Sequence, residues 1–433
     1  MPPVTTSDGI STAGWRIVLL ASLGGTLEFY DFVVFGVFAR DIAEAIFPSS
    51  TPIVSLMASF GAFAAGYLAR PIGGIVLSHF GDRYGRRTVF LLSLFVMSAA
   101  TLGMGLVPSF VTWGVWASFT MVTLRLIQGF CIGGELPGAL TYVVETAPKH
   151  APFVCGLVFA CVTMGVAVAS GVSLGVRTWL PPELVPVYGW RIAFVLGGLA
   201  GLLSFLMRRA MEESPEFARM KALASKRPFG EVLQTHRLPV LVGIGGLAAT
   251  GAFNGLFFAL MPAYLSGVLQ YGARDAVIAQ TVGVVVHAAA ILAIGRVADR
   301  VSPRLMIGIG SAALILLAFP FYNALAARTI GLVPAMTLAA LVASLVNGTF
   351  AVLLTDLFPT RIRFTGVALV FNVAFTLFSG TAPLVATTLV RDTGLSTAPA
   401  FVMIGAGVLT LLASSGLGRL GGNVLGQERA GRV

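Results

Sequence analysis

HFGDRYGRR, residues 79–87, is a charge-dense turn between two long apolar runs. A related segment, GRVADRVSPR, occupies residues 295–304, and Asp82-Arg83 aligns with Asp299-Arg300 at an offset of 217 residues. Each copy follows the second apolar run of its half of the chain. A charged turn that recurs at equivalent points of two apolar halves predicts an internally duplicated membrane fold.

A second pair of segments supports the duplication. Glu145-Thr-Ala-Pro148 follows the fourth apolar run, and Asp356-Leu-Phe-Pro359 follows the tenth, at an offset of 211 residues. Basic residues follow both segments: Lys149 and His150 after the first, Arg361 and Arg363 after the second. Two independent pairs with similar offsets, in corresponding loops, indicate that the two halves share one architecture.

The composition predicts a chain that spans a membrane. Hydrophobic residues make up 57% of the chain and charged residues only 11%, whereas a soluble domain has about 25% charged residues. The mean hydropathy is +0.91. Runs of roughly 20 apolar residues, long enough to cross a bilayer, recur at 15–39, 53–78, 88–107, 113–137, 153–176, 190–207, 238–268, 276–295, 305–325, 331–354, 365–390 and 398–418.

These runs are predicted to be helices, because backbone groups in lipid must be hydrogen-bonded within the chain. The alternating pattern of a membrane β-barrel is not visible. The predicted fold is therefore an all-α integral membrane protein, with twelve transmembrane helices in two six-helix bundles. The expected organisation is a tail over 1–14, a bundle over 15–207, a linker over 208–237, a bundle over 238–420 and a tail over 421–433.

The net charge of +10 would suit a nucleic-acid-binding protein, but the distribution of the charges argues against one. Of the 28 basic residues, two lie within spans and twenty lie at the ends that share a side with the linker. The six at the opposite side are Arg40, Arg177, Arg191, Arg274, Arg328 and Arg391. The positive-inside rule then predicts a multi-pass protein of the cell inner membrane with both termini in the cytoplasm.

Two acidic residues lie in the first apolar run. Glu28 and Asp31, within LEFYDF, are three residues apart and share a helix face. A carboxylate inside a membrane costs roughly several kcal/mol unless it is paired, protonated or hydrated. One interpretation is a proton carrier, since burial raises the pKa of a carboxyl group. The other is a structural ion pair with Arg70 or Arg125.

Arg125 begins the segment RLIQGFCIGGE in the fourth run, with apolar residues on both sides. A guanidinium there needs an anion or carbonyl groups as partners. Asp31 is the candidate resting partner, and a substrate carboxylate could compete for the same bidentate contact. Gln128 lies one turn further on, and Glu135 follows after seven more residues. The glycines of this segment and the next turn permit close helix contact: Gly129, Gly133, Gly134 and Gly138.

The remaining polar residues within spans leave alternatives open. Arg70 precedes Pro71, so it either lines a cavity or holds a carbonyl group that the proline frees. Asn254 and Asn372 lie near the middle of spans, and either could face substrate. His287 is either a pH-sensitive group or a hydrogen-bonded structural residue.

The two charged turns are candidate gates on the linker side. An aspartate there can accept hydrogen bonds from a neighbouring helix, and arginines can bind acidic groups and lipid phosphates. The alternative is ordinary positive-inside charge. The candidate gating residues are Asp82, Arg83, Arg86, Arg87, Asp299 and Arg300.

Over about residues 15–420 the chain resembles the major facilitator superfamily, and more narrowly the metabolite:proton symporter family. The segments that carry the resemblance are LEFYDF (27–32), ARPIGG (69–74), FGDRYGRR (80–87), RLIQGFCIGGE (125–135), GWRIAFVLGG (189–198), EESPEF (212–217) and LFPTRIRFTGVAL (357–369). The resemblance implies alternating access by two rocking bundles, with proton-coupled uptake. It also implies functional roles for Glu28, Asp31, Arg70, Arg125, Glu135 and the first charged turn.

The chain departs from the family pattern near the expected cavity. Gly25 replaces a usual Asn, Phe29 a usual Trp, and Leu136-Pro137 follows Glu135 where the family has other residues. These changes leave the substrate open.

The predicted function is secondary active import of a small carboxylate-bearing metabolite by proton symport, and the cavity arginines favour an organic acid. The alternatives are a symporter of zwitterions or compatible solutes, a proton-antiport effluxer and a non-transporting sensor. An enzyme is not expected, since no nucleophile–base pair, metal-ligand cluster or phosphate loop has workable spacing. The expected partners are the substrate, the proton and membrane lipids, without nucleic acid, cofactor or metal, and a monomer is expected.

Overall fold

The computed structural model describes the chain apart from residues 1–4, 7–8, 11, 85, 209–227 and 426–433. Two short strands, β1 (Thr5–Thr6) and β2 (Gly9–Ile10), pair antiparallel before the first helix. The helices of the N-terminal half are α1 (Thr12–Val37), α2 (Ala39–Ile46), α3 (Pro52–Tyr84), α4 (Arg86–Leu106), α5 (Phe110–Trp113), α6 (Val115–Ile132), α7 (Glu135–Thr146), the 3-10 turn η1 (Pro148–His150), α8 (Ala151–Trp179), η2 (Val185–Gly189) and α9 (Trp190–Arg208).

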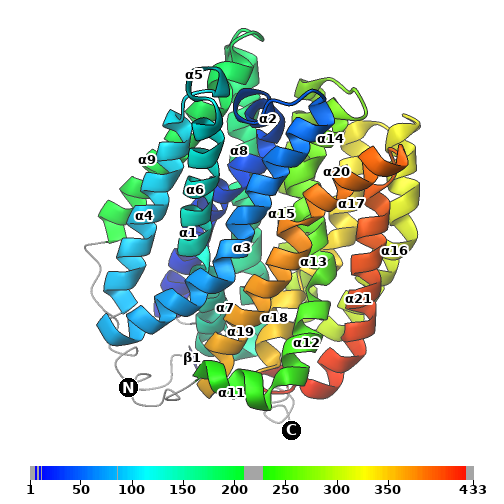
Figure 1. Cartoon of the computed structure of the whole chain (residues 1–433). Helices are drawn as coiled ribbons and strands as arrows, with labels where there is room; N and C mark the ends of the chain where they lie inside the picture. Colours follow the sequence, from blue (N-terminus) through cyan, green and yellow to red (C-terminus); the bar gives the residue numbers. More distant parts are fainter. Residues whose placement is uncertain (1–4, 7–8, 11, 85, 209–227, 426–433) are drawn as a thin grey trace.

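The C-terminal half repeats this pattern of long helices (Figure 1). Its helices are α11 (Pro228–Thr235), α12 (Arg237–Gly246), α13 (Ala248–Phe253), η3 (Asn254–Leu260), α14 (Met261–Gly267), α15 (Ala273–Ala298), α16 (Pro303–Ala326), α17 (Leu332–Asn347), α18 (Phe350–Asp356), α19 (Thr360–Phe375), η4 (Thr376–Gly380), α20 (Ala382–Thr393) and α21 (Pro399–Leu420). The helix α11 forms the described end of the predicted linker.

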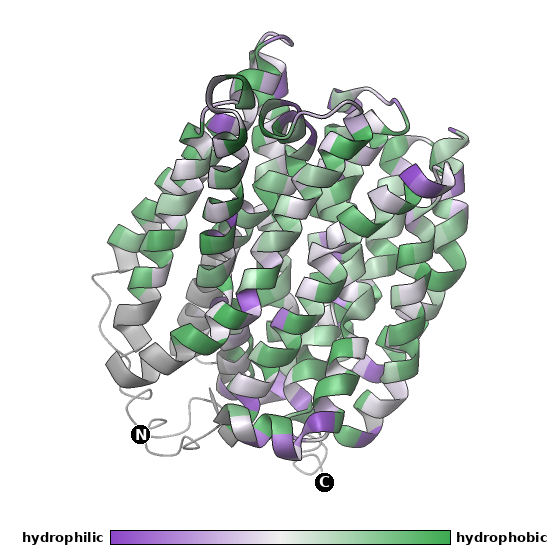
Figure 2. Ribbon diagram, viewed as in Figure 1, coloured by the Kyte–Doolittle hydropathy of each residue, from purple (hydrophilic) through white to green (hydrophobic). Residues whose placement is uncertain are grey.

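The helical architecture agrees with the twelve predicted spans. Within the described residues, ten helical segments are long and apolar enough to cross a membrane. The helices α1 and α4 occupy the positions of the first and third predicted spans. Large apolar side chains such as Leu68, Leu316 and Leu412 are exposed on the outside of the bundle, where lipid would cover them. Figure 2 shows these apolar residues along the helices, with polar residues concentrated toward the helix ends.

Three spans contain a wider helical turn that the sequence pattern did not predict. The segments η2, η3 and η4 are π-helical, and η3 and η4 lie in the middle of the seventh and eleventh spans. A π-helical turn is rare and is often found at functional sites. Both η3 and η4 contact helices of the N-terminal half, since η3 lies against α1 and η4 lies against α3.

The two halves also meet along further helix contacts. The helix α8 lies against α15, and α3 also contacts α19 and α20. The end of the molecule that carries α2, α5 and α14 is called the α2 face here, and the opposite end is called the α11 face (Figure 1).

Candidate functional site

Close contact between α3 and α6 brings Arg70 of α3 near Arg125 of α6. A methyl group at Gly129 would overlap the backbone carbonyl of Gly66, and one at Gly73 would overlap that of Phe130. One at Gly133 would overlap the carbonyl of Arg70. The glycines therefore let the two backbones touch, as small residues do at helix interfaces in membranes. The close contact predicted for this segment is present.

Arg125 is fully buried, and its guanidinium lies over three phenyl rings. The guanidinium carbon is 4.1 Å from the ring centroid of Phe32, 4.7 Å from that of Phe35 and 5.1 Å from that of Phe63. A cation within about 6 Å of a ring centroid is attracted to the ring face, and more strongly where water is absent. The rings stabilise the charge but do not neutralise it.

The hydrogen bonds of Arg125 leave part of its guanidinium available. Its Nη1 donates to Oε1 of Gln128, and Nε2 of Gln128 donates to Oγ1 of Thr101 at 2.8 Å and to the carbonyl oxygen of Asp31 at 3.0 Å. Nε and Nη2 of Arg125 have no hydrogen-bond partner in the described part of the chain. Because a buried guanidinium requires a counter-charge or acceptors, these two donors mark a place where a carboxylate can bind.

Arg70 lies at the boundary between the two halves. Its guanidinium carbon is 5.1 Å from the ring centroid of Tyr67, 5.5 Å from that of Phe32 and 5.7 Å from that of Phe371. Phe371 belongs to α19, so Arg70 contacts both halves. Pro71 lies inside α3, which continues to Tyr84. Both alternatives for Arg70, the lining of a cavity and the binding of a carbonyl group, stay predictions.

Asp31 is buried, and its carboxylate points toward α9. A methyl group at Gly201 would lie 3.4 Å from Oδ2, and one at Gly197 would overlap Oδ1. The carboxylate therefore occupies the space that these two glycines leave open. Asp31 was predicted to be the resting partner of Arg125. In the structure Gln128 bridges the two residues, since it accepts a hydrogen bond from the guanidinium of Arg125 and donates one to the backbone carbonyl of Asp31.

The structure describes less of the other two predicted proton-coupling residues, Glu28 and Glu135. Glu28 lies one turn before Asp31 in α1, and its side chain falls outside the described residues. Glu135 is the first residue of α7 and is partly buried. Their roles remain predictions.

Hydrogen bonds from the eleventh span connect the halves at the centre. Nδ2 of Asn372 donates to the carbonyl of Gly133 at 2.5 Å, and Oγ1 of Thr376 donates to the carbonyl of Tyr67 at 2.7 Å. Oγ of Ser379 donates to the hydroxyl of Tyr67 at 3.1 Å. Asn372 was predicted to face substrate, whereas Tyr67 was missed. Its position three residues before Arg70, on the same helix face, was the available signal.

Asn254, the second asparagine predicted to face substrate, bonds within its own span. Its Nδ2 donates to the carbonyl of Thr250 at 2.7 Å, and its Oδ1 has no hydrogen-bond partner in the described residues. Asn254 is buried and begins η3. The structure therefore gives Asn372 a hydrogen bond to the other half, whereas the amide of Asn254 donates within its own span.

His287 makes the contacts of a structural residue. Its Nδ1 lies 2.8 Å from the carbonyl oxygen of Ala340, and its Nε2 lies 2.8 Å from Nδ2 of Asn347. A neutral imidazole satisfies both contacts, since Nδ1–H can donate and Nε2 can accept. The rings of Phe253 and Phe258 lie 5.0 Å and 5.9 Å away, so the imidazole is enclosed by apolar groups.

Polar contacts of Glu145 and Asp299 join the halves at the α11 face. Nη1 of Arg363 lies 3.1 Å from Oε1 of Glu145. Oδ1 of Asp299 accepts a hydrogen bond from the backbone N–H of Phe153 at 3.2 Å, and Nδ1 of His150 lies 3.6 Å from Oδ2. Burial raises the pKa of Asp299, and the hydrogen bond from Phe153 and the nearby His150 oppose this rise.

The structure describes little of the other candidate gating residues. Arg300 is exposed. The first charged turn joins α3, which ends at Tyr84, to α4, which begins at Arg86. The side chains of Asp82, Arg83, Arg86 and Arg87 fall outside the described residues, as does the whole of residue 85. The gating role of both turns remains a prediction.

Asp356 differs from its repeat partner Glu145 and stays within its own half. Its carboxylate accepts hydrogen bonds from the backbone N–H groups of Gly422, Val424 and Leu425 at 2.7–2.9 Å. Nη2 of Arg304 lies 3.5 Å from Oδ2. The carboxylate thus fixes the segment after α21 against the end of α18.

The comparisons with known proteins agree with this architecture. The sequence profile described as Major Facilitator Superfamily matches residues 22–383. The glycine betaine/proline/ectoine/pipecolic acid transporter OusA of Dickeya dadantii is 30% identical over 414 residues, covering 92% of this chain and 82% of that protein. The proline/betaine transporter of Escherichia coli has the same identity and coverage.

Solved structures share the fold. The proton:xylose symporter XylE, bound to 6-bromo-6-deoxy-D-glucose, superposes with a TM-score of 0.75 at 16% identity, covering 94% of this chain and 95% of that one. The xylose transporter XylE from E. coli in a partially occluded, inward-open conformation gives 0.71 at 17% identity, covering 94% and 99%. These likenesses concern the fold of the two bundles.

Proposed function

The chain belongs to the major facilitator superfamily and is a multi-pass secondary transporter, and from this premise we propose that it imports a small zwitterion of the proline and betaine type together with a proton. The observation that carries the proposal is Arg125, whose two unpartnered donors lie beside phenyl rings at the centre of the molecule. The proposed moving parts are the bundles of residues 15–207 and 238–420, which alternately open the path at either face.

Three features favour a zwitterion over the organic acid that the arginines alone suggest. The relatives at 30% identity are named for proline and betaine. A carboxylate is also near, since Asp31 is buried and its backbone carbonyl is linked through Gln128 to Arg125. Phenyl rings next to the guanidinium groups offer faces that attract an ammonium group. Arg125 can therefore bind a carboxylate while the rings and the acidic residue accommodate a positive charge.

Asp31 is the proposed proton carrier. It is buried in a membrane-spanning helix, and its backbone is linked through Gln128 to Arg125. Because the two groups share this network, loading of a proton on Asp31 can be coupled to occupation of Arg125 by substrate. Glu28 and Glu135 remain further candidates.

The α11 face is proposed to be cytoplasmic, with both termini on that side of the inner membrane. The basic residues predicted for the outer side lie at helix ends and loops of the α2 face, and the linker helix α11 lies at the other. This distribution follows the positive-inside rule. The contacts of Glu145 with Arg363 and of Asp299 with Phe153 are then proposed as the closure of the cytoplasmic side.

The substrate class is tested by ligand-dependent thermal stability of the purified protein. A ligand that binds only the folded state stabilises it by about 2.7 kcal/mol at a concentration of 100 Kd. Proline, glycine betaine and ectoine are compared with citrate, 2-oxoglutarate and shikimate at matched ionic strength. At least one zwitterion is expected to raise the Tm, and the organic acids are not.

Stabilisation by an organic acid alone would contradict the zwitterion proposal and restore the organic acid as substrate. The Arg125→Lys variant serves as the control, because a ligand held by the central site should stabilise it much less than the native protein. Equal stabilisation of both proteins by a zwitterion would place its binding elsewhere.

His287 is proposed to have a structural role and no part in proton coupling, and substitutions of this residue test that proposal. Replacing His287 with leucine leaves the amide of Asn347 and the carbonyl of Ala340 without their partner, which is expected to destabilise the protein by about 1–3 kcal/mol. His287→Gln, which can keep one of these contacts, is expected to lose less. In both variants the pH dependence of uptake, measured in proteoliposomes, is expected to match the native protein. A displaced pH profile in the folded His287→Gln variant would make His287 part of the proton path.

A further inference from the structure

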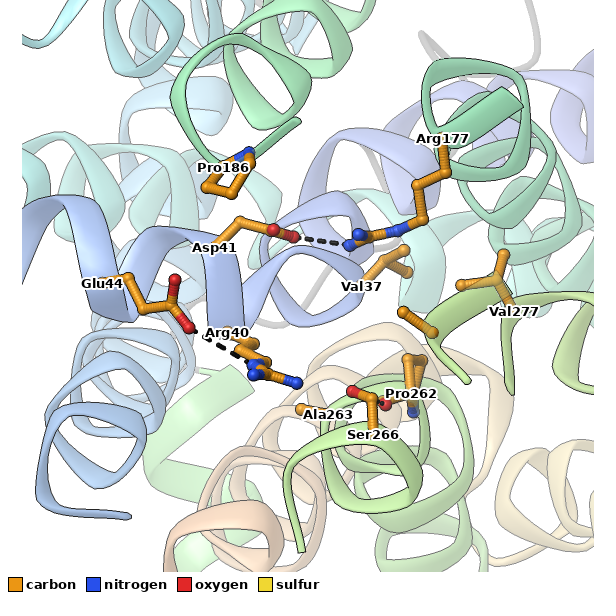
Figure 3. A pocket seen from close by; sticks show the side chains of 11 residues that line it. Val37, Arg40, Asp41, Glu44, Arg177, Pro186, Pro262, Ala263, Ser266 and Val277 are labelled. Carbon is orange, nitrogen blue, oxygen red and sulfur yellow. Dashed lines mark hydrogen bonds and ion pairs between the residues drawn. The ribbon is translucent and has the colours of Figure 1, made fainter. Parts of the chain in front are cut away.

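A pocket of about 180 Å³ lies at the α2 face between the two halves. Its wall from the N-terminal half includes Arg40, Asp41 and Glu44 of α2, and its wall from the C-terminal half includes Pro262 and Ser266 of α14 (Figure 3). One water molecule needs about 10–15 Å³ of such space. The pocket therefore has room for a small solute and not merely for a single water molecule.

A buried ion pair fixes one side of this pocket. Nη2 of Arg177, near the end of α8, lies 2.6 Å from Oδ2 of Asp41, and both side chains are largely buried. The guanidinium carbon of Arg177 is also 5.7 Å from the ring centroid of Phe38. Because both charges of this pair are satisfied by each other, the pair holds α2 against α8 and leaves ligand binding to other residues.

Arg40 has the position and the free donors to bind an anion in the pocket. Its Nε lies 3.3 Å from Oε1 of Glu44, one helical turn away, and both side chains are about half exposed. Figure 3 shows its guanidinium between α2 and the labelled Ala263 and Ser266 of the other half. An exposed ion pair of this kind is weak, because water and salt screen it. A carboxylate can therefore take up the Nη1 and Nη2 donors of Arg40 in a bidentate contact.

The pocket offers complementary groups for a molecule that carries both charges. Arg40 suits a carboxylate, and Glu44 supplies a negative charge for an ammonium group. Val37 and Pro262 supply apolar walls for methyl or methylene groups. A simple anion would meet the repulsion of Glu44, and a simple cation would meet that of Arg40, so the charges favour a small zwitterion.

The pocket also lies directly outside a close contact between the halves. Val37 lines it, and the preceding residue, Gly36, faces the seventh span. A methyl group at Gly36 would lie 2.7 Å from Cβ of Ala259, so α1 and η3 are in contact there. A solute in the pocket would remain on the outer side of this contact until the two halves separate.

We propose that this pocket is a low-affinity outer site that holds a small zwitterion between Arg40 and Glu44 before the α2 face opens. The inference rests on the proposed function, since it takes the transported zwitterion as its ligand and the α2 face as the side of uptake. The outer site raises the concentration of substrate at the entrance and leaves the central site at Arg125 to perform transport.

The test uses the full-length protein and radiolabelled glycine betaine and proline. Equilibrium dialysis of the native protein is expected to give two binding sites, one weaker than the other, and Arg40→Gln is expected to lose the weaker site. In proteoliposomes the same variant is expected to raise the KM about fivefold with unchanged kcat, the upper size expected for loss of one solvent-exposed ionic contact. Arg40→Lys, which keeps the charge, is expected to recover part of the affinity.

Arg391→Gln is the matched control. Arg391 lies at the end of α20 on the same face, is similarly exposed, and pairs with the neighbouring Asp392 at 2.7 Å, but it does not line the pocket. It is expected to leave both sites and the KM unchanged. An equal rise in KM in Arg40→Gln and Arg391→Gln would mean that the effect comes from the charge of the surface in general. That result would overturn the outer site.

The remaining outcomes separate the two proposals. A single binding site on the native protein, together with normal zwitterion uptake and an unchanged KM in Arg40→Gln, overturns the outer site alone. Neither binding nor uptake of any zwitterion by the folded native protein overturns the proposed function and the outer site together.

Discussion

Arg125→Lys is expected to lower the affinity for a carboxylate-bearing substrate by about 10- to 100-fold, the range given by the loss of a charge-assisted hydrogen bond. Lysine keeps the positive charge, but it replaces the planar fork of donors by a single ammonium group. It also loses the extended contact with the faces of Phe32, Phe35 and Phe63. The affinity is measured by ligand-dependent thermal stability and by the KM of uptake in proteoliposomes.

The matched control is Arg191→Lys. Nη2 of Arg191 donates to the carbonyl of Val107 at 3.0 Å, and its guanidinium carbon lies 4.0 Å from the ring centroid of Trp190. This arginine also combines carbonyl and ring contacts, but it lies at the α2 face, away from the centre. Its replacement is expected to lower the Tm without a comparable change in affinity. Normal affinity in Arg125→Lys would move the carboxylate site elsewhere.

Asp31→Asn is expected to abolish proton-driven accumulation and to spare counterflow exchange. Asparagine has nearly the same shape, so it fits the space beside Gly197 and Gly201, but it cannot carry a proton. Symport of one proton per substrate would give about tenfold accumulation for each pH unit of gradient, because one unit corresponds to about 1.4 kcal/mol. The accumulation ratio of the variant is expected to fall to about one, as measured by uptake with and without a pH gradient.

Glu28→Gln and the exposed Asp392→Asn complete this series. If Glu28 carries the proton, its variant loses accumulation and Asp31→Asn keeps it. Asp392→Asn, at the α2 face, is expected to behave like the native protein. Unchanged accumulation in both Asp31→Asn and Glu28→Gln would remove the first span from proton coupling.

Much of the architecture could be predicted because lipid imposes simple rules on the sequence. Long apolar runs must be helical, and the repeated charged turns reveal two related halves. The glycines of the fourth span predicted that this helix lies close to another helix. The structure identifies the other helix as α3. The isolated Arg125 stood out because a lone charge in an apolar run requires a partner.

The partners of these residues could not be predicted, because they depend on how distant helices meet. Phe32, Phe35 and Phe63 look like ordinary apolar residues of a membrane helix, and only their placement around a guanidinium gives them a further role. The π-helical segments leave no simple signature in hydropathy. Tyr67 and Thr376, which bond across the halves, lie 309 residues apart.

The repeated acidic residues make different contacts in the two halves. Glu145 and Asp356 occupy equivalent positions, yet Glu145 pairs with Arg363 of the other half and Asp356 binds the segment after α21. Duplication therefore predicts where a charge lies, and the surrounding chain decides which group it binds.

The most direct measurement is pH-gradient-driven uptake in proteoliposomes, with radiolabelled proline and glycine betaine beside a panel of organic acids. The account predicts that a zwitterion accumulates above its external concentration, that a protonophore collapses the accumulation, and that Arg125→Lys and Asp31→Asn lose it. Accumulation of an organic acid alone, or of a zwitterion without any dependence on the proton gradient, would contradict proton-coupled import of a zwitterion.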